Sequence, residues 1–176
     1  NKIIVALKEG AYRFYNFQGN LLFERKFEKV GDFSNGRAYI VWKGKFGFIN
    51  TKGDTVIAPI YDWAENFKAS ELALVKQNEK FGLIDTAGKI ILPCEYTAID
   101  KFSEGLALVS KEKKFGFADA QGKQIIPLKF DYVAEISASK GFLNGLAKVE
   151  QNKKRGLIDK TGKLIIPCEY DDIRNF

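Results

Sequence analysis

The sequence predicts an all-β protein built from tandem repeats of about 34 residues, each a three-stranded β-meander. Three observations lead to this fold class: glycines recur at a nearly constant spacing, short apolar runs of strand length lie between turn residues, and no window has a sustained 3.6-residue apolar period. A meander this short cannot bury its own apolar faces, so we expect neighbouring repeats to stack. An elongated, curved or superhelical array is the first interpretation. A closed propeller-like ring is the alternative, although propeller blades usually have four strands and roughly 40 residues or more.

The repeat is defined by glycines spaced 35, 34 and 40 residues apart, each followed by a second glycine six positions later. Around the first glycine, Lys lies two positions before, Asn or Asp three after, Pro eleven or twelve after, and an aromatic residue fourteen after. So many matches in register indicate a true internal repeat. The positions that we expect to be structural are Gly47, Gly82, Gly116, Gly156, Gly53, Gly88, Gly122, Gly162, Pro59, Pro93, Pro127 and Pro167.

The pattern covers residues 1–176 as one repeat domain. We place the repeats at 1–32 (partial), 33–66, 67–101, 102–141 and 142–175, and Phe176 begins a further repeat. The fourth of these has a six-residue insertion around 137–141. The chain begins with Asn1 and contains no Met, so we expect it to be a piece of a longer protein.

The third full copy illustrates the expected strands, which are 106–109, 115–119 and 123–127. The second turn follows an Asn/Asp-x-x-Gly pattern, in which the acid or amide caps its own turn and the glycine accepts a positive φ. Proline is expected to end the third strand because it cannot donate to a ladder. The glycine within the second strand indicates a close approach, and we expect the recurring aromatics, such as Tyr96 and Phe102, to lie over it.

The segments 102–107, 114–117 and 122–127 resemble the WG-repeat family, also called KWG repeats, and the resemblance covers essentially the whole chain. The family's namesake Trp is replaced here by Phe46, Phe81 and Phe115, and by Arg155 in the last full copy, which predicts a distinct surface there. The resemblance implies a bacterial repeat protein, often surface-associated or multi-domain, with binding or scaffold roles. The family brings no catalytic residues to this chain.

The composition argues against an enzyme, a metal protein and a cofactor protein. The chain has no His, which excludes His-dependent triads, His general bases and His metal sites. Asp85, Asp119 and Asp159 supply one carboxylate per turn, which suits turn capping better than calcium binding. Cys94 and Cys168 occupy the same slot two repeats apart, beyond bridging distance, so no disulfide is expected. Unpaired cysteines favour a reducing compartment, and both the bacterial cytoplasm and the cell surface remain open.

The net charge of +6 and the pI near 9.2 raise nucleic acid as a partner. Lys80, Lys114 and Lys154, together with Lys45, should line up along one edge of the array. Lysines at hairpin turns can equally keep the array soluble and its edges unpaired. The aromatic residues recur at slots that we expect to be buried, which disfavours the exposed stacking that single-stranded nucleic acids need.

Residues that do not repeat are the better guide to function. Trp42, Trp63 and Arg155 are candidate binding residues of this kind, and the repeated lysines Lys80, Lys114 and Lys154 are further candidates. The first hypothesis is a non-catalytic module for protein–protein interaction or scaffolding in a larger bacterial protein. The alternative is binding of carbohydrate or a cell-envelope polymer through exposed aromatics such as Trp42 and Trp63. No apolar run approaches the roughly 20 residues of a transmembrane helix, so no membrane span is expected.

Overall fold

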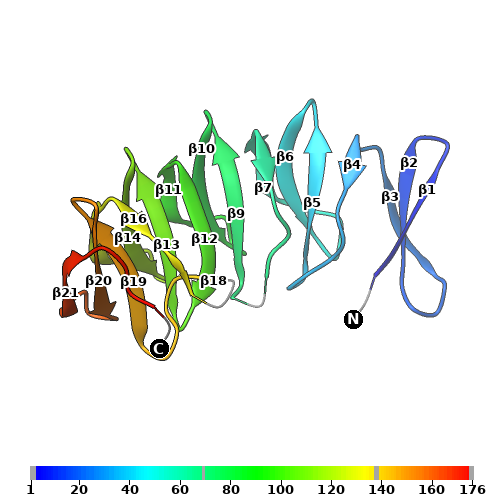
Figure 1. Cartoon of the computed structure of the whole chain (residues 1–176). Helices are drawn as coiled ribbons and strands as arrows, with labels where there is room; N and C mark the ends of the chain where they lie inside the picture. Colours follow the sequence, from blue (N-terminus) through cyan, green and yellow to red (C-terminus); the bar gives the residue numbers. More distant parts are fainter. Residues whose placement is uncertain (1–2, 69, 137–138, 175–176) are drawn as a thin grey trace. The chain divides into compact units, whose positions relative to one another are not determined.

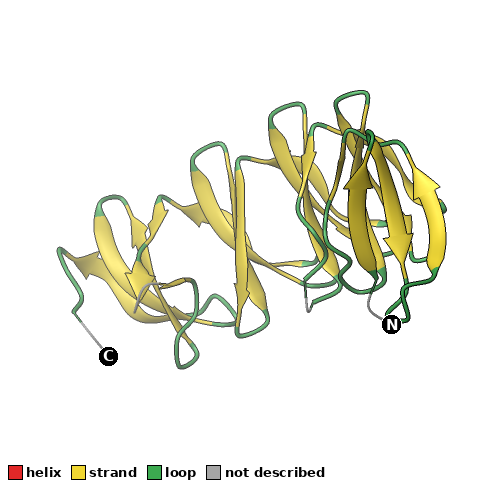
Figure 2. Ribbon diagram, turned by 90° about the vertical axis from the view of Figure 1, so that its right-hand side faces the viewer, coloured by secondary structure: helices red, strands yellow, loops and turns green. Residues whose placement is uncertain are grey.

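The computed structural model describes residues 3–68, 70–136 and 139–174, and these residues form strands and loops without any helix (Figures 1 and 2). This part of the chain accordingly contains no helix that could cross a membrane. The chain divides into two compact units, Asn1–Cys94 and Glu95–Phe176. Each unit is a set of small antiparallel sheets whose strands follow one another in sequence order, so the all-β repeat class predicted above is confirmed.

The first unit contains three sheets, and its last strand ends two residues past the unit boundary. The first sheet has the order β1-β2-β3, the second β4-β5-β6-β7, and the third β8-β9-β10-β11. Their bounds are β1 (Ile4–Lys8), β2 (Ala11–Tyr15), β3 (Leu21–Arg25), β4 (Lys29–Val30), β5 (Arg37–Trp42), β6 (Lys45–Asn50), β7 (Thr55–Tyr61), β8 (Trp63–Ala64), β9 (Leu72–Gln77), β10 (Lys80–Asp85) and β11 (Ile90–Tyr96).

The second unit contains two four-stranded sheets and a two-stranded ribbon. The four-stranded sheets have the orders β12-β13-β14-β15 and β16-β19-β20-β21, and the ribbon β17-β18 lies in the region of the predicted insertion, of which residues 137–138 are outside the described residues. The bounds are β12 (Ala98–Ser103), β13 (Leu106–Lys111), β14 (Lys114–Asp119), β15 (Gln124–Phe130), β16 (Tyr132–Val133), β17 (Glu135–Ile136), β18 (Ser139–Lys140), β19 (Leu146–Gln151), β20 (Lys154–Asp159) and β21 (Leu164–Tyr170).

Every sheet after the first has one strand more than the three that the sequence predicts. The additional strand comes first, as β4, β8, β12 or β16, and pairs with the strand after it; Val30 lies opposite Ile40, for example. Three of these strands are only two residues long, so they show no apolar alternation that would reveal them in the sequence.

The repeated glycine and proline act together at a β-bulge. Phe46 lies opposite Tyr61 and Phe48 opposite Ile57, so β7 has two more residues than β6 over the same stretch. A Cβ built on Gly47 would lie 2.5 Å from the carbonyl oxygen of Ile57, a contact that real Cβ atoms do not make. The same carbonyl approach occurs at Gly82, Gly116 and Gly156.

Two expectations about this position are therefore wrong. The atoms over the strand glycine belong to the bulged backbone of the neighbouring strand and not to the aromatic side chains. The proline also lies inside the strand, as Pro59 does in β7, because a bulge on an edge strand tolerates a residue without an N–H group.

The Asn/Asp-x-x-Gly turns have the predicted capping geometry. The Oδ1 atom of Asp85 accepts hydrogen bonds from the backbone N–H groups of Ala87 and Lys89, both at 2.9 Å. Gly88 then adopts a φ of +86° and donates its N–H to the carbonyl of Asp85. Asp119 and Asp159 cap their turns in the same way.

Phenylalanines join neighbouring sheets within each unit. The buried Phe67 packs on Phe48 with the ring centroids 4.8 Å apart, and Phe142 packs on Phe117 at the same distance. Twenty positions after the first repeat glycine, the other copies have Phe67, Phe102 and Phe176, whereas this copy has Ile136; Phe142, after the insertion, packs as Phe67 does. These rings form part of the apolar core between sheets, which is where the stability of stacked repeats is expected to reside.

Candidate binding surface

Two of the repeated lysines, Lys45 and Lys114, form ion pairs between consecutive sheets of one unit. Lys114 in β14 pairs with Asp131, and the other oxygen of Asp131 accepts a 2.7 Å hydrogen bond from the backbone N–H of Asn152, in the turn between β19 and β20. Both contacts hold the pKa of Asp131 below its usual value, the lysine contributing most. Lys45, Asp62 and Asn78 repeat the arrangement in the first unit. In these two copies the lysine slot thus ties one sheet to the hairpin of the next sheet in the same unit.

These ion pairs affect whether the candidate lysines are available to a ligand. Lys154 also forms an ion pair, with Asp171, whereas Lys80 has no ion-pair partner within the described part of the chain. A lysine held by a carboxylate offers less charge to a ligand, so Lys114 and Lys154 are better explained as structural links.

Arg155 forms two ion pairs in the slot where the other full copies have phenylalanine. Its guanidinium lies 2.6 Å from Asp172 and 3.5 Å from Glu150. Asp172 is the main cause of the raised pKa of Arg155. The surface at this position is therefore charged where the other copies have phenylalanine.

The two tryptophans lie in different surroundings. Trp42, 44% exposed, ends β5 beside a hairpin turn and packs edge-to-face on Phe27. Trp63, 36% exposed, lies in β8 and packs edge-to-face on Phe81. Of the two, Trp63 also lines a cavity, which makes it the better candidate for a ligand contact.

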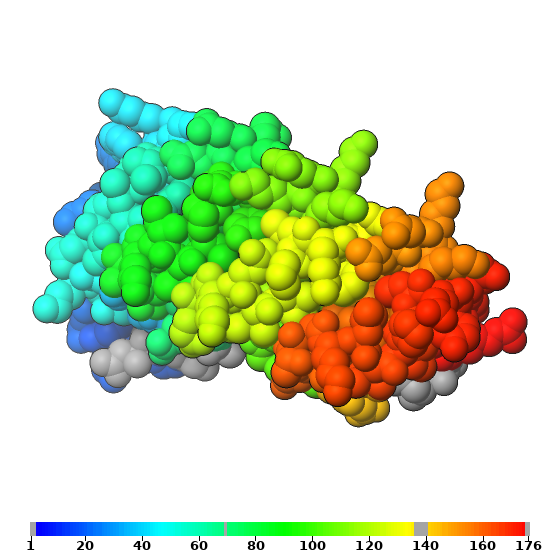
Figure 3. All heavy atoms as spheres, turned by 90° about the vertical axis from the view of Figure 1, so that its left-hand side faces the viewer, coloured from blue at the N-terminus to red at the C-terminus, as the bar shows by residue number. Residues whose placement is uncertain are grey.

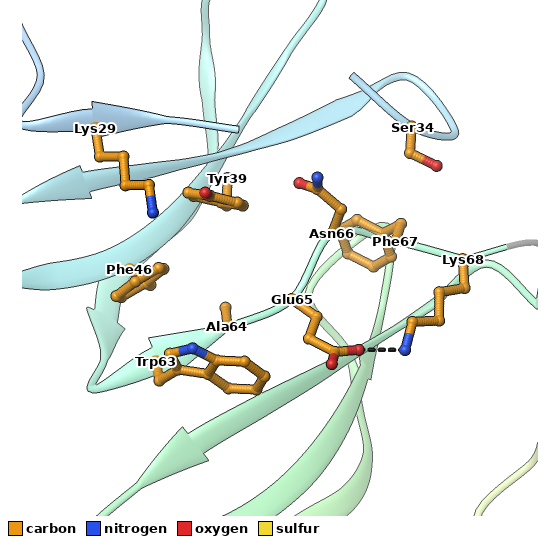
Figure 4. A pocket seen from close by; sticks show the side chains of 10 residues that line it. All are labelled: Lys29, Ser34, Tyr39, Phe46, Trp63, Ala64, Glu65, Asn66, Phe67 and Lys68. Atoms are coloured by element: carbon orange, nitrogen blue, oxygen red, sulfur yellow. Dashed lines mark ion pairs between the residues drawn. The ribbon is translucent and has the colours of Figure 1, made fainter. Parts of the chain in front are cut away.

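The cavity lies in the first unit, between strands β4 to β6 on one side and β8 with the segment 65–68 on the other (Figure 4). It is an open, shallow depression with a volume of about 560 Å³. The rings of Tyr39, Phe46 and Trp63 surround it in the close-up, and Glu65 and Asn66 line the remaining side. We call it the Trp63 cavity.

A glycine outside the repeat pattern shapes this cavity. A Cβ on Gly31 would lie 2.3 Å from the ring of Tyr39, so the missing side chain lets the ring lie against the backbone next to β4. Tyr39 is tilted against Phe46 with the centroids 5.5 Å apart. Other copies have Leu74, Leu108 and Lys148 in the slot of Tyr39. The aromatic wall is thus specific to one repeat.

Some polar groups of the Trp63 cavity have a partner in the protein and others have none among the described residues. Glu65 forms an ion pair with Lys68. Lys29 places its ammonium 5.7 Å from the centre of the Tyr39 ring and has no carboxylate partner in the residues that the structure describes. The Oδ1 atom of Asn66 is buried and lacks a hydrogen-bond partner among the same residues. The Oε2 atom of Glu65 is also buried and has its ion pair with Lys68 but no hydrogen bond among these residues. The cavity therefore combines apolar rings, a lysine without a carboxylate partner and two buried acceptors without hydrogen bonds.

The two cysteines are unpaired and partly buried. Cys94 and Cys168 are free, and burial is the main cause of a raised pKa for each thiol, which favours the protonated, unreactive form. Over the described ranges, no three Cys, Asp or Glu side chains gather in a group that could hold a metal ion. The geometry is suited to binding.

Sequence reasoning found Trp63 but missed its neighbours Tyr39 and Lys29. The available signal was the break in the repeat: Gly31 and Tyr39 differ from the residues in the equivalent slots. That they face one cavity with Trp63 depends on how two successive sheets pack, which the sequence does not state.

The fold and these internal partners define a tandem β-repeat module. The chain belongs to the WG-repeat family: the sequence profile of the WG containing repeat matches residues 12–45, 46–81, 81–115, 115–154 and 156–176. The resemblance inferred from the sequence is confirmed.

Comparison of the fold finds distant similarities. The computationally designed protein Ika8 is 11% identical, with a TM-score of 0.39, over 93% of this chain and 60% of that one. Hsv2 of Kluyveromyces lactis is 12% identical, with a TM-score of 0.42, over 93% of this chain and 59% of that one. PorZ of Porphyromonas gingivalis, a surface component of the type-IX secretion system, is 11% identical, with a TM-score of 0.42, over 98% of this chain and 28% of that one.

This chain thus spans about 60% of the length of the designed protein and of Hsv2. No curated protein sequence matches it significantly.

Proposed function

We propose that the chain is a non-catalytic module for protein–protein interaction or scaffolding. The observation that carries the proposal is that repeated residues and variable residues occupy different environments. Many residues that recur between copies have internal partners, as Gly47 and Asp62 do, whereas side chains that differ between copies, such as Trp42, are exposed. A shared frame with varied exposed groups is typical of repeat proteins that bind other proteins.

Recognition would use side chains and not strand addition. The last strand of each four-stranded sheet is an edge strand and contains a proline within a bulge, as Pro127 does in β15. Proline and bulges on an edge oppose pairing with another chain. The sheet edges are therefore poor templates for a partner's backbone.

The hairpin turns offer a more suitable surface. In the second unit, the β13–β14 and β19–β20 hairpins stand out at the top of the outline in Figure 3, in yellow-green and orange. Their tips carry Glu112 and Lys113 in one case and Asn152 and Lys153 in the other, all with positive φ. The charge at the tips differs from hairpin to hairpin, which would let a partner read the register of the repeats.

A photo-crosslinking residue in place of Trp42 or Lys113 tests the proposal in cells of the source organism. We expect the same partner protein to be trapped at both positions, and a Lys113→Glu chain to bind that purified partner at least about tenfold more weakly by calorimetry. A crosslinker at Ala58, exposed on the proline-containing edge strand β7, is the control. Trapping at Ala58 alone, or no trapped protein, would contradict this role for the hairpins.

Carbohydrate binding is the second candidate, because Trp63 shares its cavity with two further rings. Aromatic faces accommodate the apolar C–H face of a sugar ring, while nearby polar groups bond its hydroxyls. Trp42 packs on Phe27 away from this cavity and is not required. Both indoles are partly exposed, so iodide should quench both, whereas a bound glycan should protect Trp63 alone.

A further inference from the structure

We infer that the Trp63 cavity binds an acidic saccharide, with a carboxylated sugar unit seated against its rings. This deepens the carbohydrate-binding alternative and rests on it. The site lies wholly within the first unit and involves none of the repeated glycines, prolines or lysines. Phe46 occupies a repeated slot, whereas Lys29, Tyr39 and Trp63 are specific to their own copies.

The rings define the shape of the ligand. Tyr39, Phe46 and Trp63 line one cavity and are each partly exposed, so a flat, partly apolar group can contact them. The tilt of 45° between the planes of Tyr39 and Phe46 leaves no parallel slot for a planar aromatic ring between them. A puckered sugar ring, with C–H groups on its faces and hydroxyls at its rim, fits such a wall better.

The charged side chains of the cavity indicate which substituent the ligand carries. Glu65 is neutralised by Lys68, whereas Lys29 has a ring and no carboxylate as its neighbour among the described residues. A carboxylate on the ligand would complete the pairing of Lys29 at the mouth of the cavity. The whole chain carries a net charge of +6, which attracts an anionic polymer further.

The side-chain oxygen of Asn66 can accept a hydrogen bond from a ligand. The buried Oδ1 atom of Asn66 lacks a hydrogen-bond partner among the described residues, and a buried oxygen left in this state destabilises the fold. Figure 4 shows the Asn66 amide turned toward Tyr39, at the side of the cavity. A sugar hydroxyl reaching this side after a small rotation of the amide would satisfy it, and a polyanion without hydroxyl groups would not.

The test uses the whole chain with Trp42→Phe, so that Trp63 is the single indole. Three probes are titrated: cellobiouronic acid, neutral cellobiose and a poly-glutamate peptide. We expect cellobiouronic acid to change the Trp63 emission saturably and to bind about tenfold more tightly than cellobiose, since a charge-assisted hydrogen bond is stronger than a neutral one. Lys29→Gln should remove this preference and Lys29→Arg should retain it.

Calorimetry on tryptophan-containing chains supplies the matched control. Trp63→Ala should abolish binding of cellobiouronic acid, while Tyr132→Ala, in the same slot of another repeat and 41% exposed, should leave it unchanged. Circular dichroism confirms that each variant is folded.

Three results would overturn the inference, and they are distinguishable. Equal binding of the two sugars at Trp63 would refute the acidic ligand but keep the carbohydrate function. Trp63-dependent binding of poly-glutamate at the same affinity would make the ligand an acidic peptide. No saccharide binding at all would remove both, leaving only the protein-interaction proposal.

Discussion

At the scale of single residues, two glycines are required because a Cβ atom at either position would clash with a neighbouring group. Gly47 leaves space for the carbonyl of Ile57, and Gly31 leaves space for the ring of Tyr39. The first recurs in every full copy because every copy has the same bulge, and the second occurs once because only one copy has the tyrosine. Neither glycine has a positive φ, so space and not backbone conformation selects the residue.

Gly47→Ala should therefore lower the free energy of unfolding by about 1–3 kcal/mol, because the new Cβ displaces the backbone of β7. Urea unfolding followed by tryptophan fluorescence measures this, since both indoles lie in the first unit. Gly44→Asn is the control: Gly44 has a φ of +71° with open space around it, and other copies have Glu79, Lys113 and Lys153 there. Equal losses in the two variants would refute the steric explanation.

At the scale of elements, the second and third sheets are joined by one buried ring and one surface ion pair, and the two four-stranded sheets of the second unit are joined in the same way. Phe67 bridges the second and third sheets and is 2% exposed. Phe67→Ala should cost about 3–5 kcal/mol, the usual loss for a buried phenylalanine, and should lower the urea midpoint of the first unit. Phe17→Ala, at a position 65% exposed, should change it by no more than about 0.5 kcal/mol. A similar loss in both would show that the ring at 67 does not join the sheets.

The ion pair at Asp131 predicts a dependence on pH. Lys114 and the N–H of Asn152 lower the pKa of Asp131 in the folded state, so its contribution to stability is full above the ordinary value of about 3.9 and is lost as the pH falls through the lowered value. The wild type should thus be more stable than Asp131→Asn at pH 6, and the two should converge near pH 2. Urea unfolding followed by circular dichroism measures both.

Asp100→Asn serves as the control for this pH dependence. Asp100 lies in the same unit, is exposed, and has no hydrogen bond or ion pair among the described residues. Its variant should follow the wild-type curve. Curves for Asp131→Asn and the wild type that stay parallel down to pH 2 would contradict the assigned role of the pair.

At the scale of the whole molecule, the arrangement of the repeats is still a prediction. One of the two reasons for preferring an open array was that each repeat had three strands, and the sheets after the first have four. The short repeat of about 34 residues remains as the other reason. We therefore expect small-angle X-ray scattering of the monomer to give a radius of gyration clearly above the ~16 Å of a compact domain of this length. A value near ~16 Å would favour a closed arrangement.

The sequence determined the features that recur. Its period, its turn residues and its lack of helical periodicity were sufficient to predict the all-β repeat class, the WG-repeat family and the capped turns. Each of these depends on a local residue pattern that recurs in four or five copies. Trp63 could be selected as a candidate for the opposite reason, since a residue that departs from a repeat stands out.

Tertiary structure alone decided what depends on packing between strands and sheets. The two-residue strands β4, β8 and β16 exist because a neighbouring strand pairs with them, and the bulge at Pro59 depends on register. The Trp63 cavity likewise brings together Lys29, Tyr39 and Trp63 from two successive sheets. Such contacts join residues distant in sequence, and no local pattern of residues encodes the distance between them.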